Sequence, residues 1–221
     1  LSFCFTRPAN FPGPGDYSNF KVKLEAPGDE DLLNDALIRD VFIQKSLNIP
    51  HRENFEVDGG YWKKTGSAPT WQCKTPEGSI PVISGSPNAW ILSPYGNYLA
   101  SDTSFIESSC YNLATATRSV FEMKLWIDSE PGKDGALIEY TRDDGVSWTV
   151  LTPNEFGWNW NWYNSTVTAL GTSGWSGINT QNWKTVKQLL PASLSTEPKV
   201  RFRVKWASDE ENTYRGMAVD E

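Results

Sequence analysis

The sequence is poor in the residues that bind transition metals or act as nucleophiles with a base. It contains three cysteines, Cys4, Cys73 and Cys110, and one histidine, His51. Zinc sites need several Cys or His ligands at close spacing, and these residues do not supply them. A serine or cysteine nucleophile needs a nearby base, and His51 stands in an expected linker. We therefore expect no zinc site and no catalytic triad.

Long apolar runs and an excess of basic residues are missing as well. A membrane-spanning helix needs a run of about 18 apolar residues, so we expect no membrane span. The net charge is −7, with 27 acidic and 20 basic residues, which argues against a nucleic-acid partner. A Cys73–Cys110 disulfide and reduced thiols both remain open. Because the chain starts at Leu1 and stops within an expected strand, we expect it to be an excerpt from a longer protein.

Alternation of apolar and polar residues is the main pattern in the sequence. It covers residues 19–24, 121–128 and 200–206, and a period of two is typical of antiparallel strands with one buried face. Residues 136–141 and 146–151 form a predicted hairpin, in which Asp144-Gly145 supplies the positive-φ turn positions. Apolar residues within 29–40 also fit helical spacing, but we predict a turn at 27–30 and a strand at 37–43.

Segment composition predicts two domains. Residues 1–48 hold Pro- and Gly-rich segments and two strands, too few for a complete domain. A fresh series of strands, with most of the 11 tryptophans, follows Pro50. We therefore predict the end of one β-sandwich at 1–48 and a nearly whole second sandwich at 49–221.

An ordered set of short motifs in 49–221 resembles the MAM-like jelly-roll modules of secreted and cell-surface proteins of Bacteroidota. The motifs are Asn54-Phe55-Glu56, Gly60-Tyr61-Trp62, Asn88-Ala89-Trp90, 102–108, 134–140, 144–148, Gly174-Trp175-Ser176-Gly177, 200–203 and 216–220. Tyr17 with the strand after it, residues 27–30 and Asn34-Asp35 are similar to the last strands of an Ig-like domain. The implied fold is all-β: a MAM- or concanavalin-like jelly-roll sandwich of two antiparallel sheets, preceded by a partial Ig-like sandwich.

The resemblance also implies a function and a location. Such tandem modules belong to large extracellular adhesins exported by the type IX secretion pathway, and they act in cell adhesion or gliding. The implied partners are other domains of the same chain, surface glycans or neighbouring adhesin copies. The expected role is therefore a non-catalytic structural or adhesive module at the bacterial cell surface.

A structural calcium ion is a further implication of the resemblance. Calcium binds carboxylate, amide and carbonyl oxygens, and jelly-roll modules of this kind often hold one near their paired termini. The residues that match its ligands are Glu56, Asn88, Asp102 and Asp220. Acidic residues that cap turns without a metal are the alternative interpretation.

The aromatic segment 156–164 suggests a second function. In it four rings from Trp158 to Tyr163 alternate with Asn, and Trp175 follows. Exposed Trp beside Asn is how proteins hold sugars, so Trp160, Trp175, Asn159 and Asn161 are candidate sugar-binding residues, and the alternative function is a carbohydrate-binding module of a secreted enzyme. In the alternative interpretation the segment packs on the sandwich. We expect Trp160 to be exposed, with Trp158 and Trp162 filling the core.

Glycoside hydrolysis is the enzymatic alternative for a sandwich of this type. It needs two carboxylates, commonly on one strand of the concave face. Glu122 shares a strand face with Lys124, and Glu139 shares one with Thr141, so neither pairs with a second carboxylate two residues away. We therefore expect that the protein is not an enzyme.

Overall fold

The chain forms two compact units, Leu1–Ser46 and Leu47–Glu221, in a computed structural model. The structure describes residues 17–23, 36–42, 46–57, 59–66, 70–154 and 156–221. Cys4 and the predicted turn at 27–30 lie outside the described residues. The assignment of 1–48 to an Ig-like domain and of 49–221 to a MAM-like domain stays a prediction.

The described part of the first unit is a pair of antiparallel strands. Strand β1 (Tyr17–Lys23) pairs with β2 (Ala36–Phe42), and Tyr17 stands opposite Phe42. Extended backbone over 36–42 confirms the predicted strand and excludes a helix there. In this register Val22 stands opposite Leu37.

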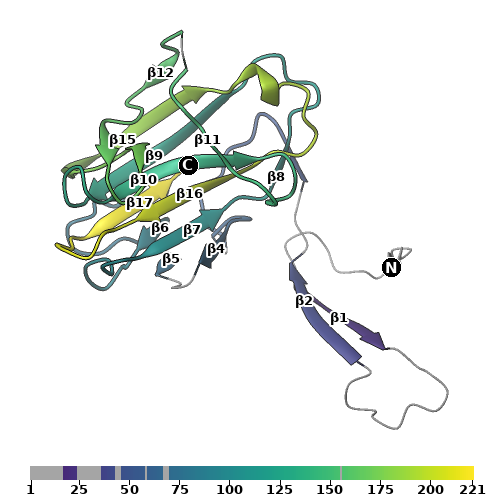
Figure 1. Ribbon diagram of the computed structural model, residues 1–221, viewed down its shortest axis with the longest axis horizontal. Helices are drawn as coiled ribbons and strands as arrows, with labels where there is room; N and C mark the ends of the chain where they lie inside the picture. The colour runs from purple at the N-terminus through teal and green to yellow at the C-terminus, as the bar shows by residue number, and fades with distance from the viewer. Residues whose placement is uncertain (1–16, 24–35, 43–45, 58, 67–69, 155) are drawn as a thin grey trace. The chain divides into compact units, whose positions relative to one another are not determined.

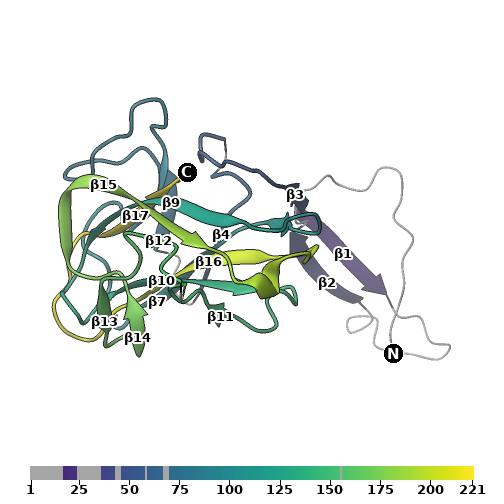
Figure 2. The same cartoon turned by 90° about the horizontal axis from the view of Figure 1, so that it is seen from above.

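The second unit is a β-sandwich (Figure 1, Figure 2). One sheet has the order β11-β10-β16-β7-β4, made of Thr149–Val150, Gly135–Thr141, Arg201–Ala207, Thr103–Glu107 and Lys63–Gly66. The other has the order β12-β15-β9-β17-β6-β5, made of Asn159–Trp160, Ile178–Leu189, Val120–Asp128, Gly216–Asp220, Ala89–Leu92 and Trp71–Lys74. Two small pairs, β3 (Ser46–Asn48) with β8 (Cys110–Asn112) and β13 (Ser165–Val167) with β14 (Thr172–Gly174), and a 3-10 helix, Ala192–Leu194, complete the unit.

Period-two alternation explains how the sheets pack. Met123, Leu125 and Ile127 of β9 point into the core between the sheets, where they meet Val204 and Trp206 of β16. The predicted strands at 121–128, 136–141 and 200–206 are thus confirmed. From β9 onward the long strands alternate between the two sheets, which is the connectivity expected of a jelly roll.

The hairpin turn between β10 and β11 has the predicted backbone conformation. Asp144 has φ 59° and Gly145 has φ 93°, both in the left-handed region that a tight turn requires. The pairing of Glu139 with Val150 confirms the hairpin. The second strand is shorter than expected, since it covers Thr149–Val150 alone.

A second, smaller core lies on the opposite face of the six-stranded sheet. Trp126 of β9 is fully buried there with Ile80, Ile91 and Ala218, and Trp183 packs against them. The sheet is therefore covered on both faces in this region. No helix among the described residues is long and apolar enough to cross a membrane.

Candidate functional site

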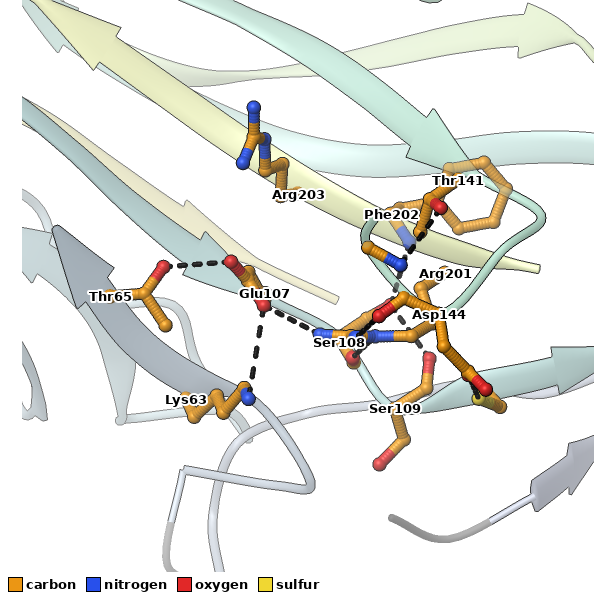
Figure 3. A network of polar contacts seen from close by, with 12 residues as sticks. Lys63, Thr65, Glu107, Ser108, Ser109, Thr141, Asp144, Arg201, Phe202 and Arg203 are labelled. Atoms are coloured by element: carbon orange, nitrogen blue, oxygen red, sulfur yellow. Dashed lines mark hydrogen bonds and ion pairs between the residues drawn. The ribbon is translucent and has the colours of Figure 1, made fainter. Parts of the chain in front are cut away.

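The outward face of the five-stranded sheet carries a network of charged side chains (Figure 3). Arg203 of β16 stands between Glu107 of β7 and Glu139 of β10 in the strand register. Arg203 Nε donates to Glu139 Oε2 at 2.6 Å, and Arg201 Nη2 donates to Glu107 Oε2 at 2.5 Å. Thr65 of β4 also donates to Glu107, at 2.8 Å. The network therefore joins four neighbouring strands.

Two aromatic rings enclose part of this network. The Arg203 guanidinium lies 4.2 Å from the ring centres of both Phe105 and Trp148. Glu107 and Glu139 are two carboxylates on one sheet face, and spacing along a single strand does not reveal them because they come from different strands. Each accepts a hydrogen bond from a guanidinium, an arrangement suited to holding strands together.

Three of the four predicted calcium ligands lie together. Glu56 Oε1 accepts the backbone N–H of Asn88 at 2.8 Å, and Glu56 Oε2 accepts Asn88 Nδ2 at 3.1 Å. Ser86 Oγ lies 3.4 Å from Glu56 Oε1 and 3.3 Å from Asp220 Oδ1. The structure thus gathers Glu56, Asn88 and Asp220 around Ser86.

Oxygen acceptors exceed hydrogen donors at this cluster. Ser86 Oγ also lies 3.2 Å from the backbone oxygen of Asn54, so three acceptors surround a hydroxyl that has one proton to donate. Two of these acceptors have a further donor, because Glu56 Oε1 accepts the N–H of Asn88 and Asp220 Oδ1 accepts the N–H of Glu221, each at 2.8 Å. Asp220 is 0% exposed, and its Oδ2 has no hydrogen-bond partner. Burial raises the pKa of Asp220 to about 6. A surplus of oxygen acceptors around a buried carboxylate fits a hard cation such as calcium.

A cavity adjoins the cluster and provides space beside it. Its volume is about 310 Å³, and it is lined by Arg52, Asn54, Gly85, Ser86 and Glu221. Asn54 and Ser86 belong to both the cavity and the oxygen cluster. The residues present therefore fit a small cation.

Asp102, the fourth predicted ligand, lies elsewhere, and its inclusion was wrong. Its Oδ2 accepts from Ser104 at 2.8 Å and from Thr70 at 3.4 Å. Asn88 is instead hydrogen-bonded to Thr75. Because Thr70 and Thr75 stand at opposite ends of β5, Asp102 is roughly 15 Å from the oxygen cluster along the strand. Asp102 holds the start of β7 in place.

A second acidic group, which the sequence analysis missed, consists of Glu130, Asp134 and Asp209. Carboxylate oxygens of these residues lie within 4.8 Å of one another. Asp134 is fully buried, accepting from Tyr98 Oη at 2.6 Å and from the backbone N–H of Asp209 at 2.7 Å. Burial raises the pKa of Asp134. Tyr98 Oη and the Asp209 N–H satisfy both oxygens of Asp134. The group therefore holds together loops that are distant from one another in the sequence.

The aromatic segment is divided between surface and core. Phe156, Trp158 and Trp160 are 76%, 62% and 64% exposed, whereas Trp162 is 5% exposed. The exposure of Trp160 and the burial of Trp162 agree with expectation, but the prediction that Trp158 fills the core was wrong. Asn159 is half-buried, and exposed Asn161 donates to the Thr185 carbonyl at 3.0 Å.

Trp175 belongs to the core, so its place among the sugar-binding residues was also wrong. It is 3% exposed, and its Nε1 donates to the carbonyl of Asn161 at 3.0 Å. Its ring packs edge-on against Trp162 at 4.9 Å and Tyr163 at 4.8 Å. A ring enclosed in this way offers no face to a sugar. Trp175 instead supports the backbone that carries Trp160.

His51, Cys73 and Cys110 each contact other groups of the chain. His51 lies 3.7 Å from Glu53 and packs near Tyr111. Cys73 and Cys110 are not bridged to each other; the thiol of Cys73 donates to the Phe55 carbonyl, and that of Cys110 lies 3.8 Å from Asp144. Burial raises the pKa of Cys73 to about 12 and also raises that of Cys110. Thiols held protonated are weak nucleophiles.

Comparison with known proteins finds only distant similarity in fold. No family model and no curated protein matches the chain. One similar solved structure is a carbohydrate-binding module of the β-sandwich superfamily, at 13% identity and a TM-score of 0.46, covering 93% of this chain and 73% of that chain. Another is the K1 cleaved adhesin domain of Lys-gingipain from Porphyromonas gingivalis W83, at 9% identity and a TM-score of 0.40, covering 73% of this chain and 88% of that chain. The likeness concerns backbone arrangement alone.

Proposed function

We propose that the chain is a non-catalytic adhesive module of an extracellular bacterial surface protein. The observation that carries the proposal is the exposed aromatic stripe, defined as Phe156, Trp158 and Trp160. Among the described residues, Trp158 and Trp160 are the tryptophans with largely exposed rings, while Trp71, Trp126 and Trp206 are fully buried. Large aromatic side chains exposed together are typical of a contact surface.

Surface glycans are the ligands that this stripe suits best. A tryptophan ring packs on the apolar face of a sugar, and neighbouring amides bind its hydroxyls. Trp160 is flanked by Asn159 and Asn161, and Asn161 is exposed beside it. A carbohydrate-binding module is therefore the second candidate function, and it uses the same residues.

Loss of the Trp160 ring should weaken glycan binding while the fold is kept. We expect Trp160→Ala to weaken binding on a glycan array by about tenfold or more, equivalent to about 1.4 kcal/mol. Val146→Ala is the matched control, since Val146 is apolar and 88% exposed at a different surface. Equal binding by wild type and Trp160→Ala would remove Trp160 from the contact surface. If the folded protein bound no glycan on the array, protein partners would be the remaining ligands of the adhesive module.

A structural calcium ion at the oxygen cluster is part of the proposal. Glu56 and Asp220 would hold it through their carboxylates, with the Asn54 carbonyl as a further oxygen ligand. Asn88, whose Nδ2 donates to Glu56 and whose Oδ1 accepts from Thr75, would position the Glu56 carboxylate. The ion would supply positive charge to a buried carboxylate and tie the segment before β4, the segment before β6 and strand β17 together. The support is the unpartnered Oδ2 of Asp220 and the three acceptors around Ser86.

Added calcium should therefore raise the melting temperature, and chelation should lower it. An ion at 100 times its dissociation constant stabilises by about 2.7 kcal/mol, which is about 5–10 °C for a unit of this size. Asp220→Asn should remove the response, whereas Glu122→Gln, at an exposed carboxylate, should retain it. An unchanged melting temperature at millimolar calcium in the wild type would exclude the site.

The finer identity of the module is also proposed. Assignment of 49–221 to the MAM-like modules, export by the type IX pathway and a role in gliding rest on the ordered motifs of the sequence. In this view the module acts beside other domains of the same chain.

A further inference from the structure

Strand β12 carries the last ring of the exposed aromatic stripe at an edge of the six-stranded sheet, next to β15 and then β9. Trp160 stands directly opposite Lys187 of β15, and Lys187 stands opposite Glu122 of β9. Residues directly opposite one another in antiparallel strands point to the same face. The row points away from the core, because the adjacent residues Met123 and Val186 face inward. An aromatic ring, a cation and a carboxylate thus lie side by side on the outer face.

The two charges in this row are paired with each other. Lys187 Nζ lies 2.8 Å from Glu122 Oε2, and the side chains are 45% and 52% exposed. Exposed ion pairs of this kind are weak, because water solvates both partners. A bound anion would therefore compete with Glu122 for Lys187 at little cost.

Arg118 adds a positive charge to the stripe beside Trp158. It precedes β9, is exposed, and its guanidinium lies 5.1 Å from the ring centre of Trp158. Within the described part of the chain, no carboxylate is paired with it. Trp158 comes two residues before Trp160, which is roughly 7 Å along an extended chain. The open ring of Trp160 therefore has an uncompensated cation close by.

The openness of the stripe is independent of the strand on the other side of β9. In the order β12-β15-β9-β17, two strands stand between β12 and β17. Residues that continued β17 past Glu221 would pair along the far edge of β9 and not along β12. The stripe and its cations are thus a surface of their own.

We propose that the exposed aromatic stripe binds acidic sugars, with a sugar ring stacked on Trp160 and a carboxylate of the same or the adjacent sugar unit paired with Arg118. A sugar carboxylate is planar and anionic, and a guanidinium binds it through two parallel hydrogen bonds. Lys187 offers a second, weaker pairing on the same face. The ligand is therefore a polysaccharide that contains uronic acid. This inference rests on the proposed glycan-binding function and narrows its ligand class.

Titration calorimetry of the 221-residue protein with uronic-acid oligosaccharides and their methyl esters tests the inference. The probes are oligomers of galacturonic, glucuronic and mannuronic acid. Esterification removes the charge and keeps the sugar ring, so each ester is the matched control for its acid. We expect at least one acid to bind about tenfold more tightly than its ester, because hydrogen bonds between charged groups are the stronger ones. Raising the ionic strength should weaken binding of the acid and leave that of the ester unchanged.

Two substitutions with different expected effects separate a binding role from a structural one. Arg118→Gln should remove the preference for the acid, while Arg142→Gln, at an exposed arginine in the β10–β11 turn, should keep it. Glu122→Gln removes the competing carboxylate and should strengthen binding of the acid by about threefold, with no change for the ester. Loss of a merely structural ion pair would not strengthen binding.

Equal binding of acid and ester by the wild-type protein would overturn the inference and leave the proposed glycan-binding function intact. A preference for the acid that persists in Arg118→Gln would overturn it as well, since the charge contact would then lie elsewhere. If neither acidic nor neutral glycans bound, the inference and the proposed glycan-binding function would fail together.

Discussion

Replacing Trp162 by alanine should lower the free energy of unfolding by about 3–5 kcal/mol, the cost of deleting a large buried ring. Trp162 is 5% exposed and packs against Trp175, Tyr163 and Phe121 at centroid distances of 4.9, 5.1 and 6.1 Å. Its Nε1 also donates to the Leu151 carbonyl at 3.2 Å. Removal leaves both a cavity and an unsatisfied carbonyl, and urea denaturation followed by circular dichroism measures the loss.

Trp158→Ala is the matched control within the same segment. Trp158 is 62% exposed, and its main contact is the Arg118 guanidinium at 5.1 Å from its ring centre. Exposed cation–π contacts contribute about 0.5–1 kcal/mol, so the control should lose no more than that. Equal losses for the two variants would contradict the division of the segment into a buried and an exposed part.

The same two residues show where sequence reasoning reached its limit. A regular strand places residues two apart on one face, so Trp158 shares the exposed face with Trp160, and the expectation that separated these two residues contradicted this rule. Trp162 leaves that face because Asn161 takes a left-handed conformation, with φ 49°, directly before it. Strand β12 ends at Trp160, and the chain then turns Trp162 into the core. The alternation of aromatic residues with Asn in the sequence gives no indication of this turn.

Local patterns predicted several strands, among them β9, β10 and β16, but not β15, the longest one among the described residues. The alternation in β9 and β16 and the Asp144-Gly145 turn are set by neighbouring residues, so they could be found without knowing the fold. The pairing of strands is a different matter. Glu107 and Glu139 share a charged network because β16 separates β7 from β10, and that order depends on the packing of the whole sandwich.

The oxygen cluster shows the same contrast. Glu56, Asn88 and Asp220 come from distant segments, and a resemblance placed them together where spacing alone could not. Asp102 was included because it also precedes a strand, but it lies at the far end of β5, where Thr70 and Ser104 bind it. Motif order locates strand ends, whereas sheet geometry decides which ends meet.

Arg201→Ala should be the most damaging change in the charged network, with an expected loss of about 3 kcal/mol or more. Arg201 is 4% exposed and donates to Glu107, to the Ser108 carbonyl at 3.3 Å and to the Asp144 carbonyl at 3.2 Å. Removing one partner of a buried ion pair leaves the other charge uncompensated, which costs about 3–5 kcal/mol. Thr65 and Lys63 still contact Glu107, so we expect the lower end of this range.

Arg142→Ala provides the comparison, because its 3.4 Å contact with Glu197 is exposed. Exposed ion pairs contribute about 0–1 kcal/mol, so this variant should unfold at nearly the wild-type urea concentration. A double-mutant cycle with Glu107→Gln separates the two contributions to the Arg201 loss. A large coupling energy means that the ion pair itself holds β7 to β16. A small coupling energy, with the full loss of stability for Arg201→Ala, would place the stabilisation in the contacts to the Ser108 and Asp144 carbonyls. If Arg201→Ala lost no more stability than Arg142→Ala, the network would not hold the sheet together.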